Sequence, residues 1–272
     1  MDVFTGKVAL ITGAGSGIGA ALSQALAARG ARVVVSDITL AAAEAVARAI
    51  AKAGGTASAH ALDVTHAEQV AALVNDTVQR HGQLDLMFNN AGISVAADAR
   101  DLALEHWRQV LDVNLMGVVY GADAAYQHMA RQGHGHIINI ASLAGLIPFP
   151  TNVPYATSKH AVVGLSLSLR AEGADLGVKV SAVCPGFIQT NIFQATRFVK
   201  VDQAKALANM PFTPIPAADA ARHILRGIER NSAIIIFPGY ARLAWRLHRL
   251  AARLLNPLHL KAIRDLRKIR HP

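Results

Sequence analysis

The chain has 272 residues, of which 52% are hydrophobic and 17% are charged, and its formal net charge is +9. This length and composition suit one large α/β domain with a substantial core, and they exclude a disordered or fibrous protein. From Tyr240 to the end the chain carries nine Lys and Arg against one Asp, while the preceding residues hold 18 basic and 17 acidic groups, so the nearly neutral body gives no reason to expect a nucleic-acid partner.

The amino-terminal segment shows no sign of an export signal. Residues 1–7 lack a basic stretch followed by an apolar one. No apolar run approaches the ~20 residues that cross a bilayer, since even residues 161–169 are short and contain Gly164 and serines. Cys184 is the only cysteine, so an internal disulfide cannot form. We therefore expect a cytoplasmic protein that does not span a membrane.

The first predicted strand, residues 7–12, leads into a glycine-rich turn and an alanine-rich helix at 20–29. Glycines occupy positions 13, 15, 17 and 19, in the spacing G-x-x-x-G-x-G from Gly13. A side chain there would hold a pyrophosphate away from the backbone N–H groups at the helix start, where the helix dipole favours anions. A glycine-rich turn alone is often only a turn, but the strand before it and the helix after it predict a dinucleotide site.

The second predicted strand, residues 31–37, ends in a carboxylate at the place where an adenosine ribose would lie. We expect Asp37 to accept hydrogen bonds from the ribose hydroxyls. The same carboxylate would repel a 2′-phosphate, and no arginine or lysine occupies positions 16, 36 or 38 to neutralise one. The sequence therefore favours NAD over NADP. The alternative is a solvated aspartate that opens a turn.

Two further strands and a long helix follow. Residues 56–64 and the segment that leads to Asn89 and Asn90 are predicted strands, although the two asparagines could be turn formers beside Gly92. A helix over 105–131 is indicated by the spacing of its apolar residues. Asn114 lies within this apolar pattern, where a buried amide can be an ordinary, hydrogen-bonded core group.

A hydroxyl, a phenol and an ammonium group are expected to meet at the carboxyl edge of the sheet. Residues 136–142 form a predicted buried strand that ends at Ser142. Tyr155 and Lys159 are four residues apart in a predicted helix and share a face. A tyrosine with a pKa near ~10 needs an environment that favours its phenolate to act as a base at neutral pH, and a nearby cation supplies one. Seen alone, however, a Tyr-x-x-x-Lys pair is commonly an ordinary amphipathic pair.

The remaining segments complete the domain. Residues 143–154, with three prolines, are predicted to form one wall of a substrate pocket, in which Leu146, Ile147 and Phe149 either meet an apolar substrate or pack beneath the loop. Residues 178–186 form the next predicted strand, in which Cys184 is a buried small residue, not a nucleophile. Residues 191–216 are typical of a substrate lid. A helix at 217–230 and a strand at 233–237 close a doubly wound, mostly parallel α/β sheet of the Rossmann type.

These motifs stand in a characteristic order: Thr12-Gly-Ala-Gly-Ser-Gly-Ile-Gly19, Asn89-Asn-Ala-Gly92, Asn114, Ser142 and Tyr155-x-x-x-Lys159. In this order the chain resembles the short-chain dehydrogenase/reductase family over about residues 5–240. The resemblance implies hydride transfer between C4 of a nicotinamide and the carbon of an alcohol or ketone. It makes Tyr155 the general acid/base and Lys159 the group that lowers its pKa and holds the ribose. Ser142 would steady the substrate oxygen, and Asn114 would hold a water of the proton relay.

The resemblance also implies the contacts with cofactor and substrate. Asp63 and Val64 would meet the adenine, and the Ile188 backbone and the Thr190 hydroxyl would hold the nicotinamide carboxamide. The full cofactor-binding set is Gly13, Gly15, Ser16, Gly17, Ile18, Gly19, Asp37, Asp63, Val64, Asn90, Ala91, Gly92, Tyr155, Lys159, Pro185, Gly186, Ile188 and Thr190. The substrate-binding set is Ser142, Tyr155, Leu146, Ile147 and Phe149. No metal ion is expected.

The predicted function is thus oxidation or reduction of an apolar secondary alcohol or ketone with NAD(H). A homodimer or homotetramer is expected, because family members commonly pair the helices that carry Asn114 and Tyr155. One alternative keeps the fold but makes the chain an NADPH-dependent ketone or acyl-thioester reductase, against which Asp37 argues. Another is a non-catalytic cofactor sensor or membrane-surface binding protein, and the complete catalytic set argues against a sensor.

Residues 240–272 are predicted to form a basic helical extension of a catalytic domain that spans 1–239. Leucines at 243, 247, 250 and 254 recur at helical spacing beside arginines at 242, 246, 249 and 253. Trp245 suits an interface, and Pro257 would separate this helix from a second basic stretch at 261–270. Such a helix can lie on an anionic membrane. Alternatively, its leucines pack on the domain or on a neighbouring subunit and its arginines are solvated.

Overall fold

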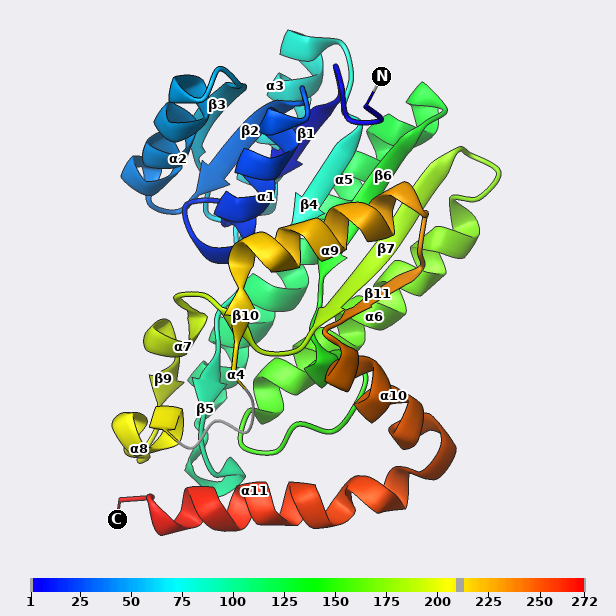
Figure 1. The fold of residues 1–272 in the computed structure, drawn as a ribbon. Helices are drawn as coiled ribbons and strands as arrows, with labels where there is room; N and C mark the ends of the chain where they lie inside the picture. Colours follow the sequence, from blue (N-terminus) through cyan, green and yellow to red (C-terminus); the bar gives the residue numbers. More distant parts are fainter. Residues whose placement is uncertain (1, 209–212, 272) are drawn as a thin grey trace.

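A computed structural model describes residues 2–208 and 213–271, and it has a seven-stranded parallel sheet at its centre (Figure 1). The strand order is β11-β7-β6-β4-β1-β2-β3. The strands are β1 Val8–Ile11, β2 Arg32–Asp37, β3 Thr56–Ala61, β4 Leu86–Asn89, β6 Gly135–Ile140, β7 Val178–Pro185 and β11 Ile234–Phe237. Each of these matches a predicted strand, so the doubly wound Rossmann architecture is confirmed.

Helices cover both faces of the sheet, because successive residues of each strand point to opposite sides. In β1, Ala9 and Ile11 pack into the core shared with α1 Gly17–Ala28, α2 Leu40–Lys52 and α9 Ala217–Glu229. Leu10 points the other way, toward α3 Ala67–His81 and α5 Gly117–Gln132. On that second face, α6 Val153–Glu172 packs near β7. The three-layer arrangement leaves the carboxyl edge of the sheet open to a site.

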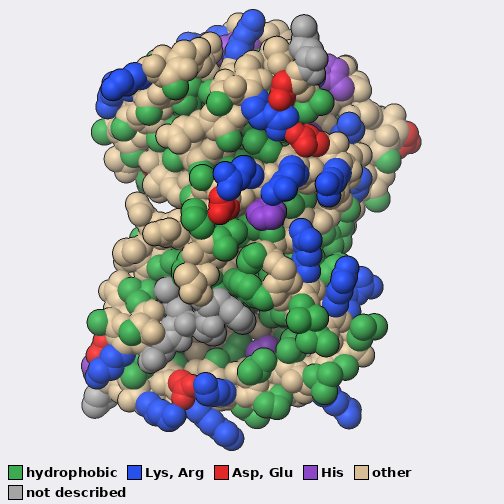
Figure 2. All heavy atoms as spheres, in the orientation of Figure 1, with side chains coloured by type: hydrophobic (Ala, Val, Ile, Leu, Met, Phe, Trp, Pro, Cys, Tyr) green, Lys and Arg blue, Asp and Glu red, His purple; other side chains and the backbone are tan. Residues whose placement is uncertain are grey.

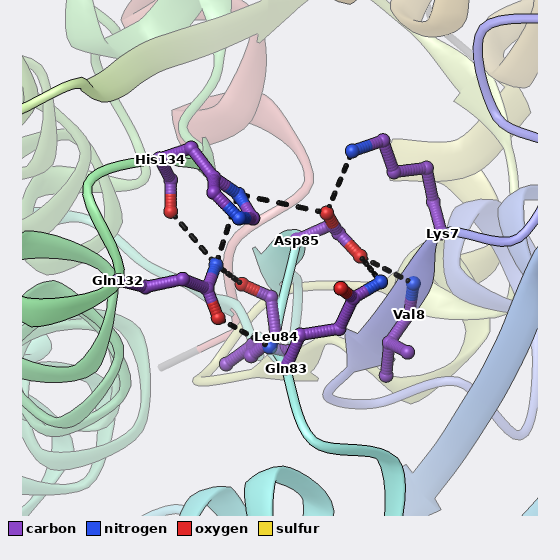
Figure 3. Close-up of polar contacts among 7 residues, drawn as sticks. All are labelled: Lys7, Val8, Gln83, Leu84, Asp85, Gln132 and His134. Carbon is purple, nitrogen blue, oxygen red and sulfur yellow. Dashed lines mark hydrogen bonds and ion pairs between the residues drawn. The ribbon is translucent and has the colours of Figure 1, made fainter.

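The opposite, amino edge of the sheet is held by one buried carboxylate (Figure 3). Asp85 is 3% exposed and accepts hydrogen bonds of 2.8 Å from the Val8 backbone N–H, the Lys7 ammonium and the Gln83 amide. Its backbone carbonyl accepts a further bond from the His136 N–H. Since these groups lie at or just before the amino ends of β1, β4 and β6, Asp85 fixes the alignment of the three central strands, and so the position of their functional ends.

The predicted helix over 105–131 is present but interrupted. It consists of α4 Leu104–Leu111, a π-helical turn at Asp112–Met116, and α5. Asn114 lies in the π turn and is fully buried. Such turns insert one extra residue into the helical ladder and often mark functional sites.

The predicted lid stretch contains the short elements α7 Ile192–Ala195, β9 Arg197–Phe198, α8 Gln203–Ala208 and β10 Ile215–Pro216, and β8 Ile188–Gln189 directly precedes it. β9 pairs with β5 Val95–Ala96, and β10 pairs with β8. The part of the predicted lid at 209–212 lies outside the described residues. The β9–β5 pairing thus ties the first half of the stretch to a distant segment, and the β10–β8 pairing brings its end back to the residues just before it.

The carboxyl-terminal extension is helical, as predicted, but its break was placed wrongly. α10 Gly239–Ala251 is followed by a 3-10 turn, Ala252–Leu255, and by α11 Asn256–Lys268. Pro257 is in the first turn of α11. Backbone N–H groups in a first turn have no partner within the helix, so a proline is tolerated there. Pro257 therefore belongs to the start of the second helix and does not end the first. Among the described residues, no helix is long and apolar enough to cross a membrane.

Candidate active site

The glycine-rich turn after β1 is packed so closely against the end of β4 that side chains are excluded. Gly13 has φ +60°, and a Cβ there would lie 2.7 Å from the Ala91 Cα. A Cβ at Gly19 would lie 2.5 Å from the Gly13 carbonyl oxygen and 2.6 Å from the Asn90 Nδ2. These contacts are far below van der Waals separation. The turn therefore keeps its backbone bare at the start of α1, which is the arrangement that a pyrophosphate requires.

Asn90 holds this turn in place and does so together with Thr12, a residue that the sequence-based site omitted. The Asn90 amide donates to the carbonyls of Thr12 (2.8 Å) and Gly13 (2.9 Å). The Thr12 hydroxyl accepts the backbone N–H groups of Asn90 (3.0 Å) and Ala91 (3.1 Å). Thr12 is the first residue of the glycine motif, and this position was the sequence signal that could have placed it in the site. Asn89 instead donates to Asn139 within the sheet.

The Asp37 carboxylate lies against the same turn. It accepts the Gly15 backbone N–H at 2.9 Å and the Thr39 N–H at 3.0 Å. A Cβ at Gly15 would be 2.8 Å from the carboxylate oxygen. Ser16 beside it is exposed, and Ile38 is 71% exposed. The arrangement fits a dinucleotide, because a negative charge and open backbone meet where strand β2 ends.

The remaining nucleotide-side residues also lie near this edge. Ile18 is half-buried and packs against the core below α1. The Asp63 carboxylate accepts the N–H (3.0 Å) and hydroxyl (2.8 Å) of Thr65, and these bonds hold the pKa of Asp63 below its ordinary value. Val64 is buried, and a Cβ at Gly117 would lie 2.8 Å from its side chain. Contact of Asp63 and Val64 with adenine stays a prediction.

Ser142, Tyr155 and Lys159 meet where β6 ends and α6 begins. The Ser142 hydroxyl hydrogen-bonds the Tyr155 phenol. The Lys159 ammonium donates to the Ile140 carbonyl at 2.8 Å and lies 5.5 Å from the centroid of the Tyr155 ring. The predicted convergence of the three side chains is therefore present in the structure.

The electrostatics of this group differ from the prediction. Burial raises the pKa of Tyr155 above its ordinary value, and the Ser142 hydrogen bond only partly offsets that rise. Burial also lowers the pKa of Lys159 to about 8. Lys159 lies over the phenol ring and not at its oxygen, so the expected lowering of the Tyr155 pKa by Lys159 is not seen.

Asn114 connects this group to the end of β4. Its side-chain oxygen accepts the Ile93 N–H at 2.8 Å, and its amide donates to the Ile93 carbonyl at 2.9 Å. A Cβ at Gly92 would lie 3.3 Å from the Asn114 oxygen and 3.6 Å from the Lys159 nitrogen. Asn114 and Lys159 thus approach each other across Gly92, while a role in a water relay stays a prediction.

The segment after β7 reaches back to the glycine turn and to the carboxyl-terminal extension. A Cβ at Gly17 would lie 3.0 Å from the Thr190 methyl group. Pro185 and Ile188 are buried, and Gly186 packs directly on the Tyr240 hydroxyl. That hydroxyl accepts the Phe187 N–H at 2.6 Å. Tyr240 was not among the predicted site residues. The only sequence signal for its contact with Gly186 and Phe187 was its position directly after Pro238 and Gly239.

The predicted substrate wall divides into packed and accessible residues. Ile147 is 8% exposed and belongs to a core cluster that includes Val162 and Cys184, so it packs beneath the loop. Leu146 is partly buried against the same cluster. Phe149 lies 6.3 Å from Phe187, whose ring stacks on Phe193 at 6.1 Å. Phe149 thus belongs to an aromatic group next to the site.

Cys184 is buried within this core, as predicted. Burial raises its thiol pKa to about 12. At neutral pH the thiol stays protonated, so Cys184 does not supply a nucleophile.

Comparisons with known proteins place the chain in a family. The sequence profile described as short chain dehydrogenase matches residues 7–199. The chain is 42% identical over 202 residues to a cyclohexanol dehydrogenase of an Acinetobacter species, which covers 73% of this chain and 80% of that protein. It is 39% identical over 190 residues to a D-threitol dehydrogenase of Mycolicibacterium smegmatis, covering 69% and 72%.

A solved structure agrees with these matches. A short-chain dehydrogenase/reductase of Burkholderia phymatum, crystallised in complex with NAD, superposes with a TM-score of 0.86 at 30% sequence identity and covers 93% of this chain and 96% of that one. The chain belongs to the short-chain dehydrogenase/reductase family. It is an oxidoreductase of the NAD(P)-dependent Rossmann type.

Proposed function

We propose that the enzyme is an NAD-dependent dehydrogenase of secondary alcohols and of the corresponding ketones. The observation that carries this proposal is the grouping of Ser142, Tyr155 and Lys159 beside the bare glycine turn. The names of two relatives, a cyclohexanol dehydrogenase and a D-threitol dehydrogenase, support an alcohol CH–OH group as the reacting centre.

The side chains have complementary tasks in this reaction. The nicotinamide, when bound, accepts or gives the hydride at C4. Tyr155 takes the hydroxyl proton of the alcohol as a phenolate, or returns a proton to the ketone oxygen as a phenol. Ser142 donates a hydrogen bond that orients the substrate oxygen. Lys159 would hold the ribose, and Asn114 fixes the backbone at Ile93 beside it.

Asp37 favours NAD over NADP. Its carboxylate already accepts the Gly15 N–H, so the negative charge is fixed at the ribose end of the turn. A 2′-phosphate at this place would meet that charge, and neighbouring positions 16, 36 and 38 are Ser, Ser and Ile. The relative crystallised with NAD is consistent with this preference.

The aromatic group of Phe149, Phe187 and Phe193 favours an apolar substrate body. The names of the two relatives include an apolar substrate, cyclohexanol, and a polar one, the polyol threitol. Phenyl rings offer no hydrogen bond to additional hydroxyl groups. We therefore assign the substrate to the cyclic or long-chain secondary alcohols.

Reduction of NAD, followed by its absorbance, tests this function. The purified enzyme is given NAD or NADP with cyclohexanol, a long-chain secondary alcohol or threitol. The proposal expects turnover with NAD and an apolar alcohol at a kcat/KM at least about tenfold above that with threitol, a difference of ~1.4 kcal/mol in the barrier. Turnover only with NADPH and a ketone or acyl thioester would establish the reductase alternative. Binding of NAD without turnover on any substrate would favour a sensor.

We also propose that the enzyme assembles as a homodimer or homotetramer through the outer faces of α5 and α6. These helices carry or adjoin Asn114 and Tyr155, and α6 exposes Leu167 at its surface. Sedimentation velocity at micromolar concentration tests the assembly, and Leu167→Glu should shift the particle toward a monomer. A monomeric wild-type enzyme would contradict it.

A further inference from the structure

The first helix of the carboxyl-terminal extension presents Leu243 and Leu250 outward. Ala241 is buried, and Tyr240, Ala244 and Trp245 pack on the core cluster beneath them. Trp245, which the sequence suggested for an interface, thus faces the domain and carries Arg249 over its ring. Small and aromatic side chains cover the inner face of α10, so the leucine stripe is left on the other side.

The exposure of these leucines is unusual for side chains of their size. Leu243 is 59%, Leu250 86%, Leu254 64% and Leu258 62% exposed. Figure 2 shows hydrophobic side chains gathered at the lower right of the molecule, where Figure 1 places α10, with Lys and Arg side chains around them. Single exposed leucines are common, but several adjoining ones mark an interaction surface. Three members of the predicted stripe, Leu243, Leu250 and Leu254, are thus turned to solvent, whereas the fourth, Leu247, is half-buried against the domain.

The basic residues of the extension divide into two groups. Arg267 pairs with Asp98 at 2.8 Å, and Arg270 forms a two-fold ion pair with Asp101 at 2.6 Å. Arg246, Arg253 and Arg264, by contrast, have no side-chain partner among the described residues. Between Arg230 and Arg264 the sequence contains no Asp or Glu at all. The exposed leucines are therefore accompanied by cations that nothing in this part of the chain neutralises.

We propose that Leu243, Leu250, Leu254 and Leu258, with Arg246 and Arg253, form a docking face for an anionic lipid bilayer. Leucines can enter the acyl boundary while arginines remain among the headgroups. A second copy of the chain fits less well, because a two-fold contact brings a face against itself. The arginines of one copy would then face those of the other without an acidic partner. An anionic surface supplies the missing charge.

The rest of the extension holds this docking face rigidly on the enzyme. Besides the two ion pairs, the Asp202 N–H donates to the Ile269 carbonyl (3.1 Å) and the His271 N–H donates to the Lys200 carbonyl (2.9 Å). These contacts form a carboxyl-terminal clamp on the segment at 98–101 and on the predicted lid. At the other end, Tyr240 contacts Gly186 and Phe187 beside the catalytic group. Docking therefore fixes the orientation of the whole catalytic domain on the membrane.

An apolar groove lies next to this face. It has a volume of about 560 Å³ and runs between the loop at Pro148–Pro150, the outer side of α6 and His259 of α11. Phe149, Val153 and Ala156 line it. A bilayer on the docking face would thus adjoin an apolar surface that continues to the loop of the substrate site, which suits an enzyme of lipid-soluble alcohols.

Vesicle flotation of the full-length enzyme tests the docking face. The probes are vesicles of phosphatidylcholine mixed with phosphatidylglycerol, and vesicles of phosphatidylcholine alone. We expect binding to the anionic vesicles, weaker binding to the neutral ones, and release as salt is raised. The combined variant Leu243→Ser, Leu250→Ser and Leu254→Ser should bind at least about tenfold more weakly, as should Arg246→Gln with Arg253→Gln, since each basic residue near the surface adds about 1 kcal/mol.

Matched controls remove exposed residues of the same kind elsewhere. Val3→Ser, Leu104→Ser and Leu176→Ser replace side chains that are 59%, 73% and 44% exposed, and Arg32→Gln with Arg108→Gln removes two exposed charges. These variants should bind like the wild type. Binding unchanged in the leucine variant, or absent from the wild type, would overturn the proposal. So would sedimentation showing that the leucine variant alone dissociates an oligomer, because the face would then belong to a second copy.

Discussion

The Asp37 carboxylate lies 2.9 Å from the backbone nitrogen of Gly15, so the end of β2 is hydrogen-bonded to the glycine-rich turn that follows β1. This contact fixes a negative charge at the place where the two dinucleotides differ. In the proposed function, Asp37 is the side chain that sets the choice of NAD over NADP.

Replacing this carboxylate should relax the cofactor preference. Asp37→Ser is expected to weaken NAD binding by about tenfold or more, because a charged hydrogen-bond acceptor contributes about 1.5–3 kcal/mol, and to strengthen NADP binding. Titration of both dinucleotides by tryptophan or cofactor fluorescence measures the change. Asp175→Ser, which removes an exposed acid far along the chain, should leave both affinities as they are. Tighter binding of NADP than NAD to the unaltered enzyme would refute the assignment.

The close packing of the glycine turn makes a second prediction. Gly19→Ala should weaken NAD binding by at least about tenfold and lower the melting temperature, because the new methyl group would lie 2.5 Å from the Gly13 carbonyl oxygen. Gly164→Ala is the control, since a Cβ there has nothing within 4 Å and alanine favours the α6 helix by up to about 1 kcal/mol. Calorimetry and NAD titration should show a lower melting temperature and weaker NAD binding for Gly19→Ala than for Gly164→Ala. Equal melting temperatures and equal NAD affinities would be incompatible with a tightly packed turn.

The carboxyl-terminal clamp should open in acid. The Arg267 hydrogen bond is the main cause that lowers the pKa of Asp98 to about 2, against an ordinary value of 3.8. Because the folded pKa lies below the unfolded one, the Asp98–Arg267 pair stabilises the docked tail above about pH 4 and loses that contribution as the pH falls from about 4 through 2. Hydrogen exchange in α11 should accelerate over this range.

The same experiment on variants identifies the carboxylate responsible. Asp98→Asn should show rapid exchange in α11 at pH 7, whereas Asp265→Asn, which removes an exposed pair with Lys268, should resemble the wild type. Slow exchange in Asp98→Asn would mean that the Asp98–Arg267 pair is not what holds the tail on the domain.

Asn114 is expected to support the site through the backbone at Ile93. Asn114→Ala leaves the Ile93 N–H and carbonyl without their side-chain partners, at a cost of about 1–3 kcal/mol for each group that stays unsatisfied. Both the unfolding free energy and kcat should fall. Ser158→Ala removes the 3.4 Å contact with the Asn114 amide and the 2.7 Å hydrogen bond that the hydroxyl donates to the Tyr155 backbone carbonyl, but it leaves both bonds of Asn114 to Ile93, so it should have the smaller effect on kcat. A larger loss in Ser158→Ala would show that Asn114 is not the supporting residue.

Much of this architecture follows from local patterns in the sequence. The alternation of strand and helix segments predicted every strand of the central sheet. The buried strands are recognisable because they are largely apolar, whereas the edge strand β3 is only partly buried and carries polar residues. The glycine turn, Ser142 and the Tyr155–Lys159 pair were also predictable, because each is defined by residues close together in the chain. Asn114 was found as a polar residue in an apolar helix, but its π turn was not predicted.

Contacts between distant segments could not be predicted. Asp98 and Arg267 are separated by 169 positions, and nothing local in either segment indicates the other. Tyr240 likewise meets Gly186 only after the chain has folded. The leucine stripe of α10 was visible in the sequence, but which side it faces depends on what the small residues and Trp245 pack against. The raised pKa of Tyr155 reflects burial. Lys159 does not offset that rise because it lies over the ring, and spacing alone does not specify this position.

The most direct test of the central claim is turnover of Tyr155→Phe with NAD and an apolar secondary alcohol, alongside its affinity for NAD. Only the ionisable hydroxyl is removed, so NAD should bind within about twofold of the wild type, while kcat should fall by at least about a hundredfold because proton transfer from the alcohol is lost. A variant that retains turnover within about tenfold of the wild type, equivalent to only ~1.4 kcal/mol in the barrier, would contradict the assignment of Tyr155 as the general acid/base.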